Sequence, residues 1–127
     1  MRKNLRLEEV EVYKVAMEIG KMVWDIVIKW EYFAKKTLGV QYVEAADSIA
    51  MNISEGYGRF HYKENKNFCY YSRGSAKETL TATTKAKERN LVSEEEFTLL
   101  SQKLDLYFRL SYGYINSIGN SGSEDIS

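Results

Sequence analysis

Apolar residues recur every three or four positions along most of the chain, and this spacing predicts helices. The clearest case is residues 10–30, where a wide apolar stripe lies opposite a face on which acidic and basic residues alternate. The predicted stripe consists of Val12, Val15, Ala16, Ile19, Met22, Val23, Ile26, Val27 and Trp30. Strand-like alternation is scarce and the chain has no proline, which favours long uninterrupted helices.

A second helix is predicted over about residues 37–55, after a turn over residues 31–36, which have no clear period. Its second half belongs to the run AADSIAMNISEGYGR, residues 45–59, in which small alanines stand where a neighbouring helix could come close. Gly56 and Gly58 predict a helix end in the left-handed conformation. The chain is therefore expected to turn back as a helical hairpin.

Two polar residues, Asn52 and Glu55, share one face of the last turn of this helix. They form either a solvated helix end with a polar cap or a buried polar network that fixes the packing. In either arrangement, Glu55 is expected to serve the turn near Arg59 and the start of the third helix.

The third helix is predicted over residues 61–90, with an interruption at residues 73–76. A glycine inside a helix costs about 1 kcal/mol relative to alanine, so we expect another helix to approach closely at Gly74. The predicted inward positions are Phe68, Tyr71, Ser75, Ala82 and Ala86.

The fourth helix is predicted over residues 94–118, because Ser93 and Glu96 form a capping box and Gly119 can end the helix. Its apolar positions follow at heptad-like spacing: Phe97, Leu100, Leu104, Tyr107, Ser111, Tyr114 or Ile115, and Ile118. The polar residues 120–127 are expected to be a disordered tail. Four helices with short links predict an all-α, antiparallel up-down-up-down four-helix bundle in one domain, residues 1–119.

The position of Arg73 depends on the register of this hairpin. With the turn centred between the second and third helices, Arg73 lies level with about Tyr42. Arg73 is then expected to pair with Glu44 or Asp47 of its own second helix, where Gly74 would allow close packing.

Composition indicates a soluble globular protein, since 44% of the 127 residues are hydrophobic and 28% are charged. No apolar run approaches the roughly 20 residues that a spanning helix needs, and the first ten residues have no apolar signal core. We therefore expect a cytoplasmic protein. Its single cysteine, Cys69, is expected to be a small packing residue.

No residue pattern indicates catalysis, and we expect no catalytic residue, metal or cofactor. A di-iron bundle needs Glu-x-x-His pairs, but His61 is the only histidine and is expected to be a capping or surface residue. The glycines at 56 and 58 are not followed by the Lys-Ser or Lys-Thr pair of a phosphate-binding loop. The carboxylate pair Glu44 and Asp47 indicates a charged helix face.

The net charge is zero, but residues 59–89 hold eight basic and three acidic residues, an excess of five. Aromatic residues alternate with these charges, so the third helix could bind phosphates and stacked bases; the alternative is a solvated face. The candidate nucleic-acid contacts are Lys63, Lys66, Lys77, Lys85 and Lys87. The ten tyrosines also make subunit interfaces plausible.

The runs AADSIAMNISEGYGRF, YYSRGSAKET and NLVSEEEF, after LEEVEVYKVAMEI in the first helix, resemble a known family. It is the family of four-helix bundle proteins encoded within 23S ribosomal RNA intervening sequences, which includes the accessory variability protein of diversity-generating retroelements. The family pattern falls on Ala45, Ala46, Ser48, Ile49, Asn52, Ile53, Glu55, Gly56, Gly58, Arg59, Arg73, Gly74, Ser75 and Glu78.

The resemblance implies a homopentameric ring without known enzymatic activity, and in the retroelement branch a basic ring that binds nucleic acid and a reverse transcriptase. The sequence departs from the pattern in two places. Val43 and Glu44 stand where many members have arginine, and Ala50 stands where many have proline. The first change removes positive charge and argues against tight nucleic-acid binding.

Two hypotheses about function follow. In the first, the protein forms a ring that acts as a structural or adaptor protein and contacts another protein. In the second, it is an accessory protein that binds RNA or DNA through the third helix, weakly and with steep salt dependence. The orientation of the third-helix lysines in the assembled ring distinguishes the two.

Overall fold

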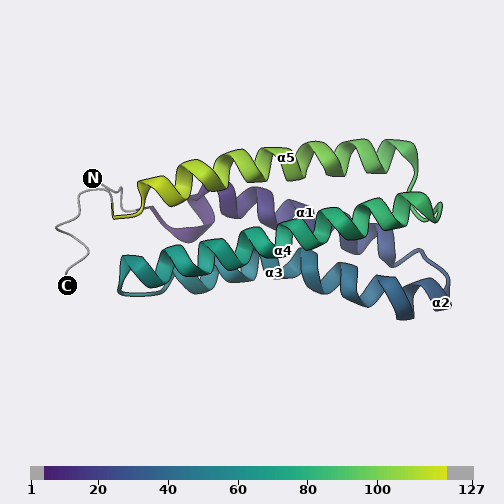
Figure 1. Cartoon of the computed structure of the whole chain (residues 1–127), viewed down its shortest axis with the longest axis horizontal. Coiled ribbons are helices and arrows are strands. Elements are labelled where there is room, and N and C mark those ends of the chain that lie inside the picture. The colour runs from purple at the N-terminus through teal and green to yellow at the C-terminus, as the bar shows by residue number, and fades with distance from the viewer. Residues whose placement is uncertain (1–4, 120–127) are drawn as a thin grey trace.

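A computed structural model describes residues 5–119, which form an all-helical bundle (Figure 1). This confirms the predicted all-α four-helix fold, and no strand occurs within the described range. The predicted tail, 120–127, lies outside the described residues. The long helices are α1 (Glu11–Val27), α3 (Val40–Tyr57), α4 (Tyr62–Glu88) and α5 (Glu94–Ser117), and the short turns are η1 (Leu7–Glu9), α2 (Tyr32–Ala34) and η2 (Lys35–Gly39).

The four long helices are arranged in the order α1, α3, α4, α5 around the bundle. Helix α1 packs against α3 and α5, and α4 packs against the same two helices. Figure 1 shows α4 and α5 nearer the viewer and α1 behind them. The side of the bundle formed by α1 and α3 is therefore opposite the side formed by α4 and α5.

The core confirms the predicted stripe of α1, of which only Met22 is partly exposed. The capping box of α5 is also confirmed, since the Glu96 amide donates to Ser93 Oγ at 3.0 Å and the Ser93 amide donates to Glu96 Oε1 at 2.9 Å. At the far end of the bundle, Trp30 is buried and its indole N–H donates to the Leu91 carbonyl oxygen at 2.8 Å.

The predicted turn over residues 31–36 is wrong, because helical structure already begins at Tyr32. A π-helical turn, Lys35–Gly39, connects this first turn to α3. A π turn adds a residue to the turn and shifts the phase of the side chains, so the apolar period is interrupted there. Tyr32 and Phe33 are exposed, so these two large aromatic residues do not mark a buried helix face either.

The predicted left-handed helix end at Gly56 and Gly58 is also wrong. Gly58 has φ −81° and ψ −2°, and positive φ occurs within residues 5–119 only at Asn90 and Gly119. Gly56 is instead buried against α4, where an added Cβ would lie 2.8 Å from both Asn65 Oδ1 and Phe68 Cβ. Its hydrogen side chain therefore allows the close approach of α3 and α4.

The predicted inward face of α4 is correct at Ala82 and Ala86 but wrong at Phe68, Tyr71 and Ser75. Tyr71 is 57% exposed, and the other two are half-buried. The buried positions are Asn65, Cys69, Ser72, Ala76, Thr79, Ala82, Thr83 and Ala86. They follow a heptad-like spacing but include small polar residues, so hydrophobicity alone does not reveal them.

Buried hydroxyl groups join α4 to its neighbours. Ser72 Oγ donates to the Ile49 carbonyl oxygen at 2.8 Å and lies 2.5 Å from the Tyr107 hydroxyl oxygen. Farther along, the Tyr42 hydroxyl lies 2.7 Å from Thr83 Oγ1. Because each buried polar group has a partner, α4 can pack on a polar stripe without a large desolvation cost.

These contacts correct the register of the hairpin. Since Ser72 meets Ile49, Arg73 lies level with about Ser48 rather than Tyr42. Arg73 forms no ion pair with a carboxylate of residues 5–119, so the predicted pair with the second helix is wrong. The close approach at Gly74 is wrong too, because no atom of another described element lies within 4 Å of the position of an added Cβ.

Candidate interaction surfaces

An apolar groove runs along the outer side of α1 and α3. It contains two hollows, of about 320 and 350 Å³, and the indole of Trp24 lines both. We define the α1–α3 groove by its lining residues, Met17, Gly20, Trp24 and Ile28 from α1 and the C-cap that follows it, with Val40, Val43, Glu44, Asp47, Ala50 and Met51 from α3. The three large apolar residues from the first helix follow one another at near-helical spacing, beside the stripe that faces the core.

Large apolar side chains of this groove are unusually exposed. The exposed fractions are 52% for Met17, 54% for Trp24, 53% for Ile28, 52% for Val40 and 68% for Met51. A contiguous apolar surface rimmed by charges is typical of a site that binds another macromolecule. Tryptophan in the centre of such a surface is a frequent source of binding energy.

The groove also contains two carboxylates that have no cation within ion-pair distance among residues 5–119, Glu44 and Asp47. Burial raises the pKa of the Asp47 carboxyl, and its Oδ1 would lie 3.0 Å from a Cβ at Gly20. The cations nearby are Lys35 and Lys21, and the latter binds Asp25 at 2.9 Å. Asp47 is therefore partly desolvated without gaining an ion pair among residues 5–119.

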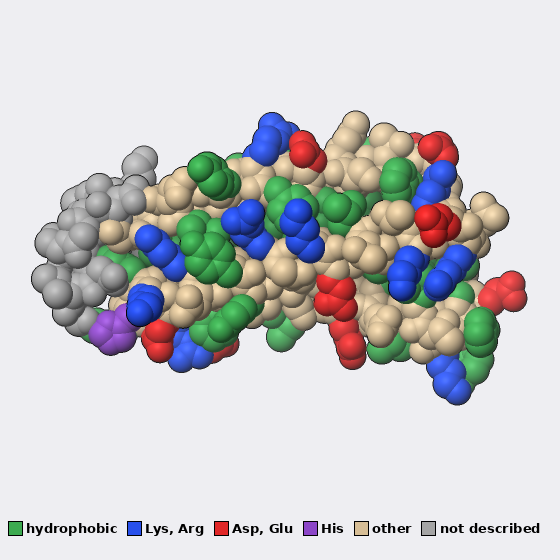
Figure 2. Space-filling model, viewed as in Figure 1, with side chains coloured by type: hydrophobic (Ala, Val, Ile, Leu, Met, Phe, Trp, Pro, Cys, Tyr) green, Lys and Arg blue, Asp and Glu red, His purple; other side chains and the backbone are tan. Residues whose placement is uncertain are grey.

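The opposite side of the bundle carries a basic and aromatic surface, which we call the α4–α5 face. It consists of Lys66, Tyr70, Arg73 and Lys77 from α4 with Phe108 and Tyr112 from α5. The α4 members are four, three and four residues apart and so share one side of the helix. Figure 2 shows Lys and Arg side chains gathered among hydrophobic ones on this side.

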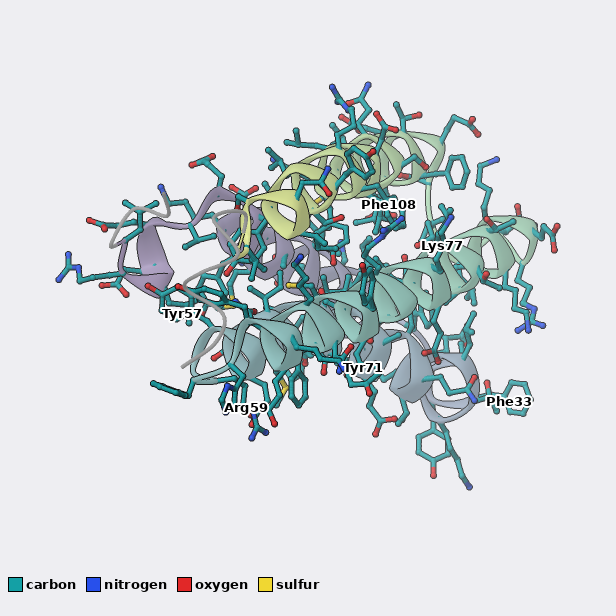
Figure 3. All side chains as sticks on the ribbon, turned by 60° about the vertical axis from the view of Figure 1, so that its left-hand side comes forward. Phe33, Tyr57, Arg59, Tyr71, Lys77 and Phe108 are labelled. Atoms are coloured by element: carbon teal, nitrogen blue, oxygen red, sulfur yellow. The ribbon has the colours of Figure 1, made fainter. Side chains whose placement is uncertain are left out.

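The two helices meet in this face where the Lys77 ammonium lies 5.0 Å from the centre of the Phe108 ring. Figure 3 shows this pair between α4 and α5, whereas Arg59 and Tyr71 lie on the α3 side of α4. Tyr70 and Tyr112 are 52% and 65% exposed. The cations Lys66, Arg73 and Lys77 have no carboxylate within ion-pair distance in the described range.

The family-pattern residues of the hairpin lie together at one end of the bundle. The Arg59 guanidinium binds Glu55 at 2.7 Å and lies 4.9 Å from the centre of the Phe68 ring. This confirms that Glu55 serves the turn near Arg59, and its exposure favours the solvated helix end. Asn52 is half-buried, and its side-chain amide donates to the Ser48 carbonyl oxygen at 2.9 Å.

The family-pattern residues of α4 lie apart from this cluster at the end of the hairpin. Arg73, Gly74, Ser75 and Glu78 lie in the middle of α4, where Gly74 and Glu78 are exposed. The structure therefore brings together Asn52 through Arg59 but leaves the two parts of the pattern separate.

The five lysines predicted to contact nucleic acid lie in different surroundings. Lys87 binds Glu94 at 2.8 Å and contacts the Phe97 ring, so its charge is partly neutralised. Lys66 and Lys77 belong to the α4–α5 face, while Lys63 and Lys85 are exposed on α4 without an ion pair in residues 5–119.

Two further residues singled out in the sequence take ordinary positions. His61 is the exposed N-cap residue of α4, and its side chain makes no capping hydrogen bond. Cys69 is 2% exposed and packs with Ile115 and Ile118, as predicted for a small packing residue.

Sequence reasoning missed the α1–α3 groove. The signal was available, because Met17 and Trp24 interrupt the face of α1 that otherwise alternates in charge. Apolar residues on the face opposite the core indicate a second contact surface.

The structure is a small helical bundle with two distinct surfaces, an apolar groove and a basic and aromatic face. The family model described as 23S rRNA-intervening sequence protein matches residues 8–113, and the chain belongs to this family. This confirms the resemblance seen in the sequence. No curated protein matches the chain. Within residues 5–119, no helix is both long and apolar enough to cross a membrane, and no group of three His, Cys, Asp or Glu residues is placed to hold a metal ion.

Proposed function

We propose that the protein assembles with copies of itself into a ring and serves as a structural or adaptor protein in the cytoplasm, without catalytic activity. The observation that carries this proposal is the α1–α3 groove, which exposes half or more of five large apolar side chains. Covering such a surface releases water from apolar area, and this drives association. A second copy is always available to cover it.

The family resemblance supports a ring of five copies. With a chain mass of 14.7 kDa, a pentamer has a mass of 5 × 14.7, or 73.5 kDa. A ring presents the same surface several times, so even weak contacts to a client become strong through multivalency. A reverse transcriptase is the kind of client that the resemblance implies.

Light scattering after size exclusion tests the proposal at micromolar protein concentration. We expect the wild type near 73.5 kDa and Trp24→Glu near the 14.7 kDa of one chain, because a carboxylate in a desolvated contact is costly. Leu99→Glu is the matched control, since Leu99 is 49% exposed on α5 and lies outside the groove. A wild-type protein that stays monomeric contradicts the proposal.

A second candidate function is nucleic-acid binding, which the unpaired cations of α4 favour. Lys63, Lys66, Lys77 and Lys85 could contact phosphates, but such contacts carry no sequence specificity. Four contacts would make affinity fall steeply with salt, and we expect a mobility shift to disappear at about half-molar salt. A shift that survives this salt concentration contradicts phosphate-only binding.

A further inference from the structure

We propose that the ring interface joins the α1–α3 groove of one copy to the α4–α5 face of the next. This inference rests on the proposed self-assembly and names its two surfaces. Because the surfaces differ and lie on opposite sides of the bundle, the contact is heterologous. Each copy then contributes its groove to one neighbour and its face to the other.

Charge is the first argument for this pairing. Glu44 and Asp47 of the groove lack cations, and Arg73 and Lys77 of the face lack carboxylates, within residues 5–119. Lys35 and the internally paired Lys21 also line the two hollows, so the excess of negative charge in the groove is small and local. Docking would bring Glu44 and Asp47 close to the cations of the face and so give both carboxylates partners of opposite charge.

Shape is the second argument. The groove extends over eleven residue steps from Met17 to Ile28, and the face extends over eleven steps from Lys66 to Lys77. At 1.5 Å per residue, each is about 16 Å long. The two surfaces therefore match in length, and the exposed rings of Tyr70 and Tyr112 can contact the apolar residues of the groove.

The third argument is Gly74, which lies beside the α4–α5 face. Glycine in a helix costs about 1 kcal/mol relative to alanine and usually marks a close approach of another backbone. Among residues 5–119, no atom outside the backbone of α4 itself lies within 4 Å of an added Cβ there. A helix of the next copy, approaching at Gly74, accounts for the glycine.

Docking of groove against groove is disfavoured by the same charges. A symmetric contact would place Glu44 and Asp47 of both copies close together, and like charges across an interface oppose association. The heterologous contact also removes Lys66, Arg73 and Lys77 from solution. In the assembled ring, only outlying cations such as Lys63 and Lys85 then remain for nucleic acid.

Mixing two defective chains tests the pairing. Trp24→Glu has a blocked groove and an intact face, whereas a chain with Tyr70→Glu and Lys77→Glu has the reverse. Each alone should be a monomer, and the mixture should form a heterodimer of 2 × 14.7, or 29.4 kDa, that grows no further. A mixture that stays monomeric overturns the inference.

A charge exchange gives an independent readout. Asp47→Lys and Lys77→Glu should each reduce assembly at least tenfold, and the two changes in one chain should restore it. Lys85→Glu is the control, because it makes the same charge change on an exposed position of α4 outside the face. A double variant as defective as either single one contradicts the pairing.

Different results contradict self-assembly and the proposed interface. A monomeric wild type contradicts both self-assembly and the interface. An assembled wild type whose mixed variants give no heterodimer contradicts only the interface. A helical far-ultraviolet circular dichroism spectrum and a cooperative thermal transition of each monomeric variant verify that the bundle is folded, so loss of assembly reports on the contact.

Discussion

Hydroxyl groups at the centre of the bundle replace part of its apolar core. Ser72 is fully buried and joins the Ile49 carbonyl oxygen of α3 to the Tyr107 hydroxyl of α5. We expect Ser72→Ala to lower the free energy of unfolding by about 1–3 kcal/mol, because two buried polar groups lose a partner. Urea denaturation measures this change.

The control is a double variant. Tyr107→Phe removes the hydroxyl that Ser72→Ala leaves unpaired, so the combined loss should be smaller than the sum of the two single losses. Strictly additive losses would show that the hydrogen bond between Ser72 and Tyr107 does not couple α4 to α5.

The buried phenols also make stability depend on alkaline pH. Burial raises the pKa of Tyr42 and that of Tyr107 from 10.0 to about 12. Between these values the unfolded chain releases the phenolic protons and the folded chain keeps them, so the free energy of unfolding falls as pH rises from 10 to 12. The stabilisation is fully present below pH 10 and decreases by roughly 2–3 kcal/mol for each phenol.

Melting temperatures measured across this pH range check the prediction. Tyr42→Phe should reduce by about half the decrease of the melting temperature with pH, since one of the two phenols with a raised pKa is removed. A slope that is the same in Tyr42→Phe and the wild type would show that other groups cause the alkaline unfolding.

At the scale of the helices, two glycines should respond in opposite directions to alanine. Gly56→Ala places a methyl group 2.8 Å from Asn65 Oδ1 and Phe68 Cβ, and we expect it to destabilise the bundle by about 1–3 kcal/mol. The methyl group of Gly74→Ala meets no atom of another helix within 4 Å in the part of the chain that the structure describes. This substitution should stabilise the monomer by up to about 1 kcal/mol, measured in an assembly-deficient background such as Trp24→Glu.

Thermal unfolding of the two variants tests the α3–α4 contact. Equal effects of the two substitutions would contradict the close approach at Gly56. If Gly74→Ala stabilises the monomer but weakens assembly, the glycine is retained for the contact between copies.

The helices that sequence reasoning predicted best are those whose buried positions are hydrophobic. In α1, the stripe from Val12 to Trp30 is almost entirely core, and in α5 the Ser93 cap and the heptad of large apolar residues are both observed. In α4 the buried stripe contains Ser72 and Thr79, so the larger side chains of Phe68 and Tyr71 gave the wrong face.

The hairpin register could not be derived from the position of the glycines. The turn between α3 and α4 lies over residues 58–61, later than the assumed centre, because Gly56 packs inside the helical contact rather than ending it. The contact between Ser72 and Ile49 places Arg73 about six residues, or 9 Å, from its expected level along the second helix, and this changes its expected partner.

At the scale of the whole molecule, composition predicted the class of surface but not its place. The basic excess of residues 59–89 was visible in the sequence. Only the structure shows that Lys87 forms an ion pair and that Lys66 and Lys77 form none with residues 5–119. The groove was missed because its apolar residues lie on a helix face that otherwise alternates in charge. An apolar residue on an otherwise charged helix face is the sequence signal expected of a surface that contacts another molecule.

The most direct test of self-assembly through the α1–α3 groove is the acrylamide quenching of tryptophan fluorescence as a function of protein concentration. Trp24 is 54% exposed and Trp30 is 9% exposed, so only Trp24 contributes an accessible fraction in the single chain. The variant Trp24→Phe shows which part of the quenchable fluorescence comes from Trp24. The account predicts that the accessible fraction disappears as the assembly forms. An assembled protein in which Trp24 stays fully quenchable would contradict it.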